Sequence, residues 1–277
     1  EVLKKYAVEM IRNTGYEELN LSSLSSSDYS KLEELLLFLI DECNRQKINI
    51  SLPSLRIDAF SLDVMNKVQD VKKSSLTFAP EAGTQRMRDV INKGLTLDNI
   101  LEGARLAFEG GWNKVKLYFM LGLPFETEED IRGIAELCNE VAKVYYDTVP
   151  KEKRNGRVSI TASTSFFIPK PFTPFQWAPM NTLEEFRDKA YITRTAITEQ
   201  LNQRSIKYNW HDTDVSVLEG VFARGDRRVA DVIMYAYEHG CMFDAWNEYF
   251  HYDTWLEAFE QNGLSIAFYN NRERSTD

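Results

Sequence analysis

Residues 114–130 place a strand, a tight turn and a helix in immediate succession, and this order constrains the fold most. Residues 114–120 are a β-branched and aromatic run too short for a helix, so they predict a strand buried on both faces, as in a parallel sheet. Gly122 and Pro124 end the run, and Thr127 with Asp130 has the spacing of a helix capping box. The turn is therefore either a ligand-lining corner of an α/β fold or a βα corner without a ligand.

The same strand-and-helix unit recurs before and after this segment. The predicted strands are residues 18–22, 48–52, 76–79, 114–120 and 158–167. Helical patterns separate them, and the chain opens inside a helix that ends at Gly15. A strand roughly every 30 to 40 residues is typical of βαβ units in a parallel sheet. Right-handed crossovers would curl these units into an open half-barrel, and a doubly wound sheet is the alternative. Small or polar residues at every strand tip favour the half-barrel.

The composition is that of a globular chain. With 277 residues, of which 43% are hydrophobic, it can build one sizeable core and a smaller appended region. The net charge of -9 argues against a strongly electrostatic nucleic-acid binder and leaves room only for a local basic groove. Without an apolar run of membrane-spanning length or a signal-peptide pattern, we expect a cytoplasmic protein with no membrane partner. The separated cysteines Cys43, Cys138 and Cys241 offer neither a disulfide framework nor a CxxC metal site.

Four ordered segments carry a resemblance to a known family. They are FAPEAGTQR at residues 78–86, INKG at 91–94, KLYFMLGLPFET at 116–127 and PKPFTPFQW at 169–177. Together they resemble the radical S-adenosylmethionine superfamily, and most of all its members that carry a cobalamin-binding domain in front of the radical core. The resemblance implies an α/β fold, a partial (β/α)6 TIM-like half barrel. Residues 1–178 would form the core and residues 179–277 a mainly helical C-terminal extension.

The family's hallmark motif, CxxxCxxC, is absent from the sequence. In the family, these three cysteines follow the first barrel strand and hold a 4Fe–4S cluster. This chain opens with a helix that lacks a preceding strand, and it shows five predicted strands where the family has six. We therefore expect a fragment without the first strand, with the cluster ligands and any cobalamin domain upstream of Glu1. The three cysteines cannot substitute, because cluster ligands must converge on one edge of the barrel.

The resemblance assigns the first two strand tips to the polar end of S-adenosylmethionine. Ser22 and Ser23 stand where the family receives the amino group, although its usual carboxylate is missing here. Ser54 and Arg56 would approach the carboxylate or the ribose, since a guanidinium can grip a carboxylate with two hydrogen bonds. The alternative for Arg56 is a surface pair with Asp58.

The later strand tips would complete the cofactor site. Glu81 and Thr84 would take polar groups of the ribose or the methionine, and Lys116 would project into the barrel. The alternative for Glu81 is that it only caps the following helix. Two further elements would lie against adenine: the Gly122 to Pro124 corner and the backbone near Ile168.

The resemblance implies an enzyme that reduces the sulfonium of S-adenosylmethionine and releases a 5′-deoxyadenosyl radical. Its protein would mainly orient the cofactor and shield the radical. A flavodoxin or ferredoxin would supply the electron, and cobalamin would make methyl or methylthio transfer plausible. The substrate, RNA or a small molecule, is not assigned. The alternative from another class is a non-catalytic α/β scaffold or interaction module.

The C-terminal part offers weaker candidates. Thr182 and Glu185 form a further capping box in front of a helix. His211 with Asp212 has acid–base potential, but a capping or surface pair explains it as well. Residues 224–228 could clamp an anionic substrate or a nucleic acid, or form salt bridges on a helix. We expect no metal site, because His239-Gly240-Cys241 lacks further ligands.

Overall fold

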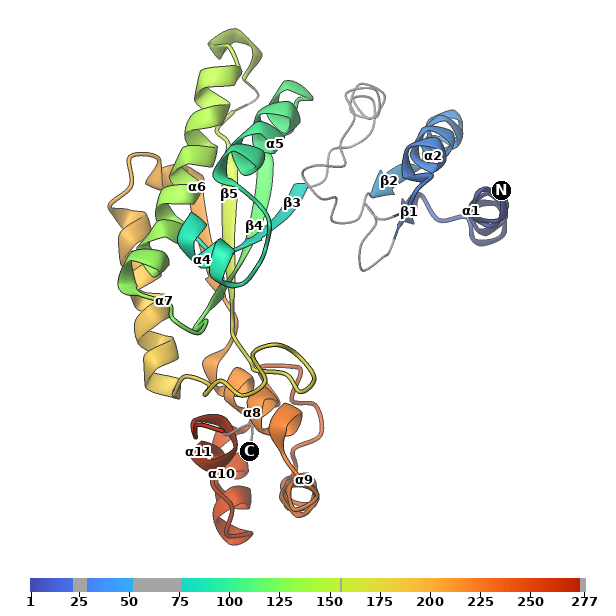
Figure 1. Ribbon diagram of the computed structural model, residues 1–277. Helices are drawn as coiled ribbons and strands as arrows, with labels where there is room; N and C mark the ends of the chain where they lie inside the picture. The colour runs from blue at the N-terminus through green and yellow to red at the C-terminus, as the bar shows by residue number, and fades with distance from the viewer. Residues whose placement is uncertain (22–28, 52–75, 155, 275–277) are drawn as a thin grey trace. The chain divides into compact units, whose positions relative to one another are not determined.

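The computed structural model describes residues 1–21, 29–51, 76–154 and 156–274 (Figure 1). The chain forms two compact units. The first contains Glu1–Phe119, Arg132–Ser163 and Arg194–Asn209. The second contains Met120–Ile131, Thr164–Thr193 and Trp210–Asp277.

The first unit begins with two helices and two short strands. These are α1 (Val2–Thr14), β1 (Glu18–Asn20), α2 (Leu32–Gln46) and β2 (Asn49–Ser51). Strands β1 and β2 pair in parallel, with Leu19 opposite Ile50. Helix α1 ends at Gly15 as predicted, because that residue takes the left-handed φ of 68° that a C-terminal cap requires.

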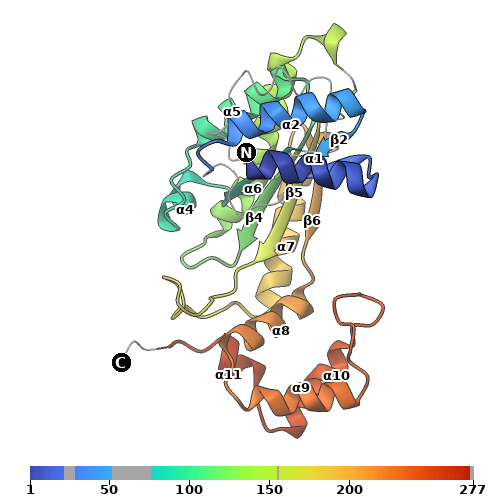
Figure 2. The ribbon, with the colours of Figure 1, turned by 90° about the vertical axis from the view of Figure 1, so that its right-hand side faces the viewer.

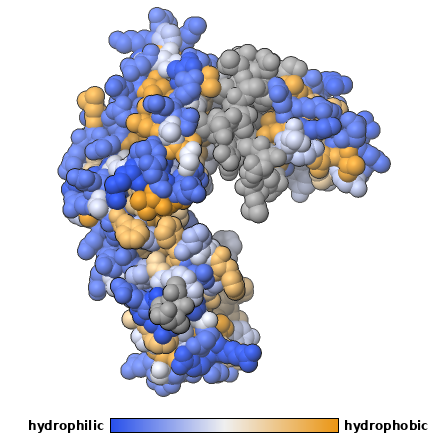
Figure 3. Space-filling model, viewed as in Figure 1, coloured by the Kyte–Doolittle hydropathy of each residue, from blue (hydrophilic) through white to orange (hydrophobic). Residues whose placement is uncertain are grey.

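Helices α1 and α2 are amphipathic and pack against each other. Ile11 of α1 and Leu39 and Ile40 of α2 are buried. Several other apolar side chains remain exposed, among them Tyr6 at 55% and Met10 at 53%. Apolar residues are accordingly visible on the surface over α1 and α2 (Figure 3).

Four strands form a larger parallel sheet, so the α/β class with a parallel sheet is confirmed. They are β3 (Leu76–Glu81), β4 (Lys114–Leu121), β5 (Ser159–Phe166) and β6 (Ile206–Trp210), in that order across the sheet. Figure 2 shows β4, β5 and β6 side by side. Strand β4 pairs in parallel with β3, with Leu76 opposite Val115. At the other edge of β4, the Phe167 N–H donates to the Leu121 carbonyl at 2.8 Å.

Strand β6 was not predicted. Residues 158–167 were expected to be the last strand, yet β6 extends the sheet beyond β5. Its sequence, IKYNW, lacks a continuous apolar run, and three of its five residues are exposed. A short, mostly exposed strand at the edge of a sheet gives little hydrophobic periodicity to detect. The predicted domain division after residue 178 stays a prediction.

The prediction that residues 114–120 are buried on both faces is wrong. In β4, buried and more exposed residues alternate along the strand. The buried set comprises Val115, Leu117, Phe119 and Leu121. The opposite face carries Lys116 and Tyr118, and the Tyr118 side chain is 38% exposed. One face of the strand therefore belongs to the core, while the other presents a cation and a phenol.

Helices follow the strands of this sheet. They are α4 (Gln85–Val90), α5 (Leu97–Glu109), α6 (Glu128–Thr148) and α7 (Leu183–Thr198), with short 3-10 turns at Lys151–Lys153 and Gln203–Ser205. Helices α5 and α6 run alongside the strands (Figure 1). They meet through the rings of Phe108 and Tyr145, whose centroids are 5.2 Å apart.

The second unit ends in four helices, which agrees with the predicted helical C-terminal part. They are α8 (Thr213–Arg224), α9 (Val229–Glu238), α10 (Tyr252–Gln261) and α11 (Ile266–Asn270). Their apolar faces share a core that includes Val221, Val232, Trp255, Phe259 and Tyr269. In the part of the chain that the structure describes, no helix is long and apolar enough to cross a membrane.

Two helices that begin in the second unit, α7 and α8, start with side-chain caps. The Asp212 carboxylate accepts hydrogen bonds from the N–H groups of Asp214 and Val215, at 2.9 and 3.1 Å. Asp212 is therefore the N-cap of α8, and this explains the His211-Asp212 pair without catalysis. The capping box of Thr182 and Glu185 is confirmed by reciprocal bonds of 2.7 and 3.2 Å.

The turn after β3 touches α6 backbone to backbone. A Cβ atom added to Gly83 would lie 2.2 Å from the Ile134 nitrogen and 2.3 Å from the Gly133 carbonyl carbon. A Cβ atom added to Gly133 would lie 2.6 Å from Cγ2 of Thr84. Gly83 and Gly133 thus permit a close contact between the turn after β3 and α6, and a residue with a Cβ atom has no room at either position.

We expect Gly83→Ala to lower the free energy of unfolding by about 3 kcal/mol, because backbone atoms must move to admit the methyl group. Urea denaturation followed by circular dichroism measures this loss. The control is Gly94→Ala, where φ is positive, at 64°, unlike at Gly83, and nothing lies within 4 Å of the added Cβ. That variant should lose only about 1 kcal/mol. Equal losses in the two variants would contradict the close contact.

Candidate functional site

The first candidate corner lies at the end of β3 and contains the predicted residues Glu81 and Thr84. The strand pairing shifts between Phe78 and Glu81, and Glu81 has a left-handed φ of 68°. Its carboxylate pairs with Nζ of Lys93 at 3.2 Å, and both side chains are partly exposed. The corner therefore presents a carboxylate and an ammonium group to solvent at the carboxyl end of a strand.

A buried arginine holds this corner, and sequence reasoning did not single it out. Arg88 is 1% exposed and donates to the carbonyl oxygens of Ala82, Gly83 and Leu95 at 3.0 to 3.1 Å. Burial lowers the pKa of Arg88. The Thr84 hydroxyl accepts from the Met87 N–H at 3.2 Å and caps α4. The sequence shows only an arginine in a short helix, so its carbonyl partners could not be foreseen.

The second candidate corner follows β4 and contains Gly122. Its φ is 85°, and its N–H donates to Oε2 of Glu126 at 2.9 Å. A Cβ atom at this position would lie 2.7 Å from Oδ1 of Asn181 and 2.7 Å from Cε1 of Phe186. Glycine is therefore required at position 122 for two reasons. The backbone is left-handed there, and Asn181 and Phe186 occupy the space that a Cβ atom would need.

A buried ion pair fixes the Gly122 corner. The Glu126 side chain is 3% exposed, and its Oε2 lies 2.6 Å from Nζ of Lys189 on α7. Burial raises the pKa of Glu126, opposed by Lys189 and by the Gly122 N–H. Asp130 adds a second anchor by accepting from the backbone N–H and the hydroxyl of Thr127, both at 2.8 Å. Sequence reasoning quoted Glu126 only within a motif, because its partner lies 63 residues away.

The remaining predicted cofactor residues lie in several places. Lys116 is on the partly exposed face of β4, with Nζ 4.5 Å from the centroid of the Tyr118 ring. Pro124 lies in the turn after Gly122, and Ile168 follows β5; both are partly buried.

The first two predicted strand tips lie outside the described residues. They comprise Ser22, Ser23, Ser54 and Arg56. The convergence of Arg56, Glu81 and Gly122 on one mouth thus stays a prediction.

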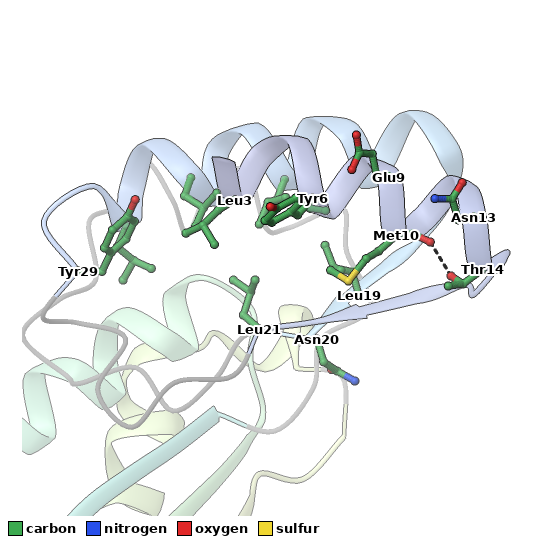
Figure 4. Close-up of a pocket in the computed structure, with 14 residues that line it drawn as sticks. Leu3, Tyr6, Glu9, Met10, Asn13, Thr14, Leu19, Asn20, Leu21 and Tyr29 are labelled. Atoms are coloured by element: carbon green, nitrogen blue, oxygen red, sulfur yellow. Dashed lines mark hydrogen bonds between the residues drawn. The ribbon is translucent and has the colours of Figure 1, made fainter. Parts of the chain in front are cut away.

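A pocket of about 750 Å³ lies among α1, β1 and α2 (Figure 4). Leu3 and Tyr6 of α1, Leu19 of β1, and Leu21 are among the apolar residues that line it. None of the predicted cofactor residues that the structure describes takes part in the lining. The pocket is mostly apolar and is therefore a poor match for the charged groups of S-adenosylmethionine.

The cysteines do not form a cluster site. Cys43, Cys138 and Cys241 are each buried and free. Burial raises the pKa of all three thiols, which disfavours the thiolate that binds iron. Across the described ranges, no group of three or more His, Cys, Asp or Glu side chains could hold a metal ion. The described residues therefore do not fit an iron–sulfur cluster.

Comparison with known proteins finds one family model that matches part of the chain. Residues 1–138 match the model of the radical SAM superfamily. The chain is also 31% identical over 258 residues to the uncharacterized protein MJ0966 of Methanocaldococcus jannaschii. That match covers 93% of this chain and 52% of the relative, so the chain spans about half of that protein's length.

Two solved structures show distant similarity to the chain. A radical SAM methyltransferase from Sphaerobacter thermophilus aligns with a TM-score of 0.43 and 12% identity, over 76% of this chain and 57% of that one. A sugar phosphate isomerase/epimerase from Parabacteroides distasonis aligns with a TM-score of 0.36 and 14% identity, over 80% and 75% of the two chains. Similarity at this level assigns no activity.

The ion pair at the Gly122 corner predicts a large effect of Lys189→Met. We expect the free energy of unfolding to fall by about 3 kcal/mol, because the change leaves a buried carboxylate without its cation. Thermal and urea unfolding would measure the loss. The matched control is Lys170→Met, which removes an equally short but exposed pair with Glu219, at 2.6 Å. That variant should change stability by less than about 1 kcal/mol.

The pH profile of stability gives a second readout of the same prediction. In the folded state, the pKa of Glu126 is raised above its ordinary value of 4.5. The contribution of Glu126 to the free energy of unfolding is therefore complete below pH 4.5. It is lost as the pH rises through the folded-state pKa. In Lys189→Met the pKa of Glu126 rises further, so the loss of stability with rising pH should extend to higher pH. Glu126→Gln should abolish this pH-dependent loss. A profile unchanged in both variants would contradict the assignment.

Proposed function

We propose that this chain is the S-adenosylmethionine-binding core of a radical SAM iron–sulfur enzyme. The observation that carries the proposal is the superfamily match over residues 1–138. The strand ends support it, because β3 and β4 are parallel neighbours and each ends in a tightly held turn. Ligands in parallel α/β folds bind at such ends.

Described residues of β3, of β4 and of the turns that follow them suit the chemistry of the cofactor. The Glu81 carboxylate can accept from ribose hydroxyls or from the amino group of the methionine part. The Lys116 ammonium can pair with the methionine carboxylate. The Gly122 corner, which has no Cβ atom, would let an adenine ring approach the backbone. When bound, S-adenosylmethionine would supply the radical chemistry, and these residues would bind and orient it.

The proposal extends to the ligands of the iron–sulfur cluster and to the partners of the enzyme. We propose that the cysteines of the 4Fe–4S cluster are supplied by sequence other than residues 1–277, because the three cysteines present do not fit. A flavodoxin or ferredoxin would be the reductant in the cytoplasm. The resemblance to cobalamin-linked members extends the proposal to methyl or methylthio transfer, on RNA or on a small molecule.

Calorimetric titration with S-adenosylmethionine tests the proposed site. We expect Glu81→Gln to weaken binding about tenfold, because it removes a charged acceptor. The matched control is Glu102→Gln, a surface residue of α5 that pairs with Arg105. It should bind as the unaltered chain does. If the unaltered chain binds no S-adenosylmethionine even when joined to a cluster-bearing segment, the chain is an α/β interaction module instead.

Reconstitution with iron and sulfide tests the assignment of the cluster ligands. We expect residues 1–277 to develop no 4Fe–4S absorption or electron paramagnetic resonance signal, since their thiols are buried singly. A cluster lost on Cys138→Ser would contradict this. The reading frame before Glu1 is a further check, because a CxxxCxxC motif within about 30 residues of Glu1, one βα repeat length, would support the proposal. The same reading frame tests cobalamin use, which requires a cobalamin-binding domain there.

A further inference from the structure

Arg224, at the end of α8, is buried without a full set of hydrogen-bond partners. It is 6% exposed, and its Nη1 donates to the carbonyl oxygen of Asn270 at 3.2 Å. Its Nε and Nη2 atoms are buried and have no hydrogen-bond partner among the described residues. A buried guanidinium with unpaired donors is costly, so an anion at this position would be strongly favoured.

The surroundings of Arg224 add positive charge. Arg274 donates from Nη2 to the carbonyl oxygens of Arg224 and Tyr269, at 3.4 and 2.9 Å, and its own Nε is buried without a partner. Burial, together with Arg274 and Arg272, lowers the pKa of Arg224 to about 10.

The nearby acid does not compensate this charge. The Asp226 carboxylate is engaged by Arg228, with Nη2 at 2.7 Å. No ion pair to Arg224, Arg272 or Arg274 occurs in the part of the chain that the structure describes. Three neighbouring guanidinium groups are thus left without an ion-pair partner among the described residues.

The free atoms of Arg224 indicate the shape of the missing partner. Nε and Nη2 lie on one edge of the planar guanidinium, and that edge makes two parallel hydrogen bonds to two oxygens of one oxyanion. Three positive groups balance a dianion better than a monoanion. Arg272 is stacked on the Phe268 ring at 3.8 Å, which holds its charge beside the site.

We propose that Arg224, Arg272 and Arg274 bind a phosphoryl group, with the Nε and Nη2 edge of Arg224 holding two of its oxygens. The ligand reaches Arg224 by displacing the side chain of Arg274, which is only partly buried. The proposal does not depend on the S-adenosylmethionine site, because its residues all follow residue 223.

Inorganic phosphate is the probe. In isothermal titration and thermal unfolding at constant ionic strength, phosphate should bind the full chain saturably and raise its melting temperature. Arg224→Lys keeps the charge but loses the two-pronged edge, so it should weaken phosphate binding at least tenfold. Arg274→Gln, at a less buried position, should weaken it as well. Arg105→Lys, on α5, is the matched control and should bind normally.

Three results would overturn the proposal. The first is phosphate binding of equal strength in the unaltered chain and in Arg224→Lys. The second is succinate binding that depends on Arg224 while phosphate does not bind, which would assign the site to a carboxylate. The third is an unaltered chain that does not respond to phosphate while Arg224→Met unfolds at a higher temperature. That result would make Arg224 a structural cation without a ligand.

Discussion

The close approach of backbone at the ends of the strands is the constraint on which the candidate site depends. At Gly83 the chain contacts the backbone of α6, and at Gly122 it contacts Asn181 and Phe186. Neither position has room for a Cβ atom. Close contact fixes where each strand ends and where the next helix begins, so it also fixes which side chains stand at the strand ends.

Buried charges then hold these corners in place. Arg88 satisfies the carbonyl groups of the turn after β3, and Glu126 satisfies the Gly122 N–H while Lys189 balances its charge. In both places a charged side chain replaces the water that an exposed turn would bind. Glu81 and Lys93 at the first corner, and Lys116 on β4, remain partly exposed.

Arg224 differs from the other buried charged groups. Arg88 has its donors paired with carbonyl oxygens, and Glu126 has a cation. Arg224 instead has positive neighbours and two donors without a partner among the described residues. The rule that a buried charge needs partners therefore leads to different conclusions for these residues. A satisfied buried charge supports the fold, whereas an unsatisfied one indicates a missing anion.

The sequence by itself determined the alternation of strands and helices, the helix cap at Thr182, and the ordered motifs that resemble the radical SAM superfamily. Each of these depends on neighbouring residues or on ordered motifs. It did not determine β6, whose five residues are mostly exposed, or the single buried face of β4. Only the tertiary structure decided which charges are buried and paired. Glu126 and Lys189 lie 63 residues apart, and burial follows from packing between distant segments, which local spacing does not encode.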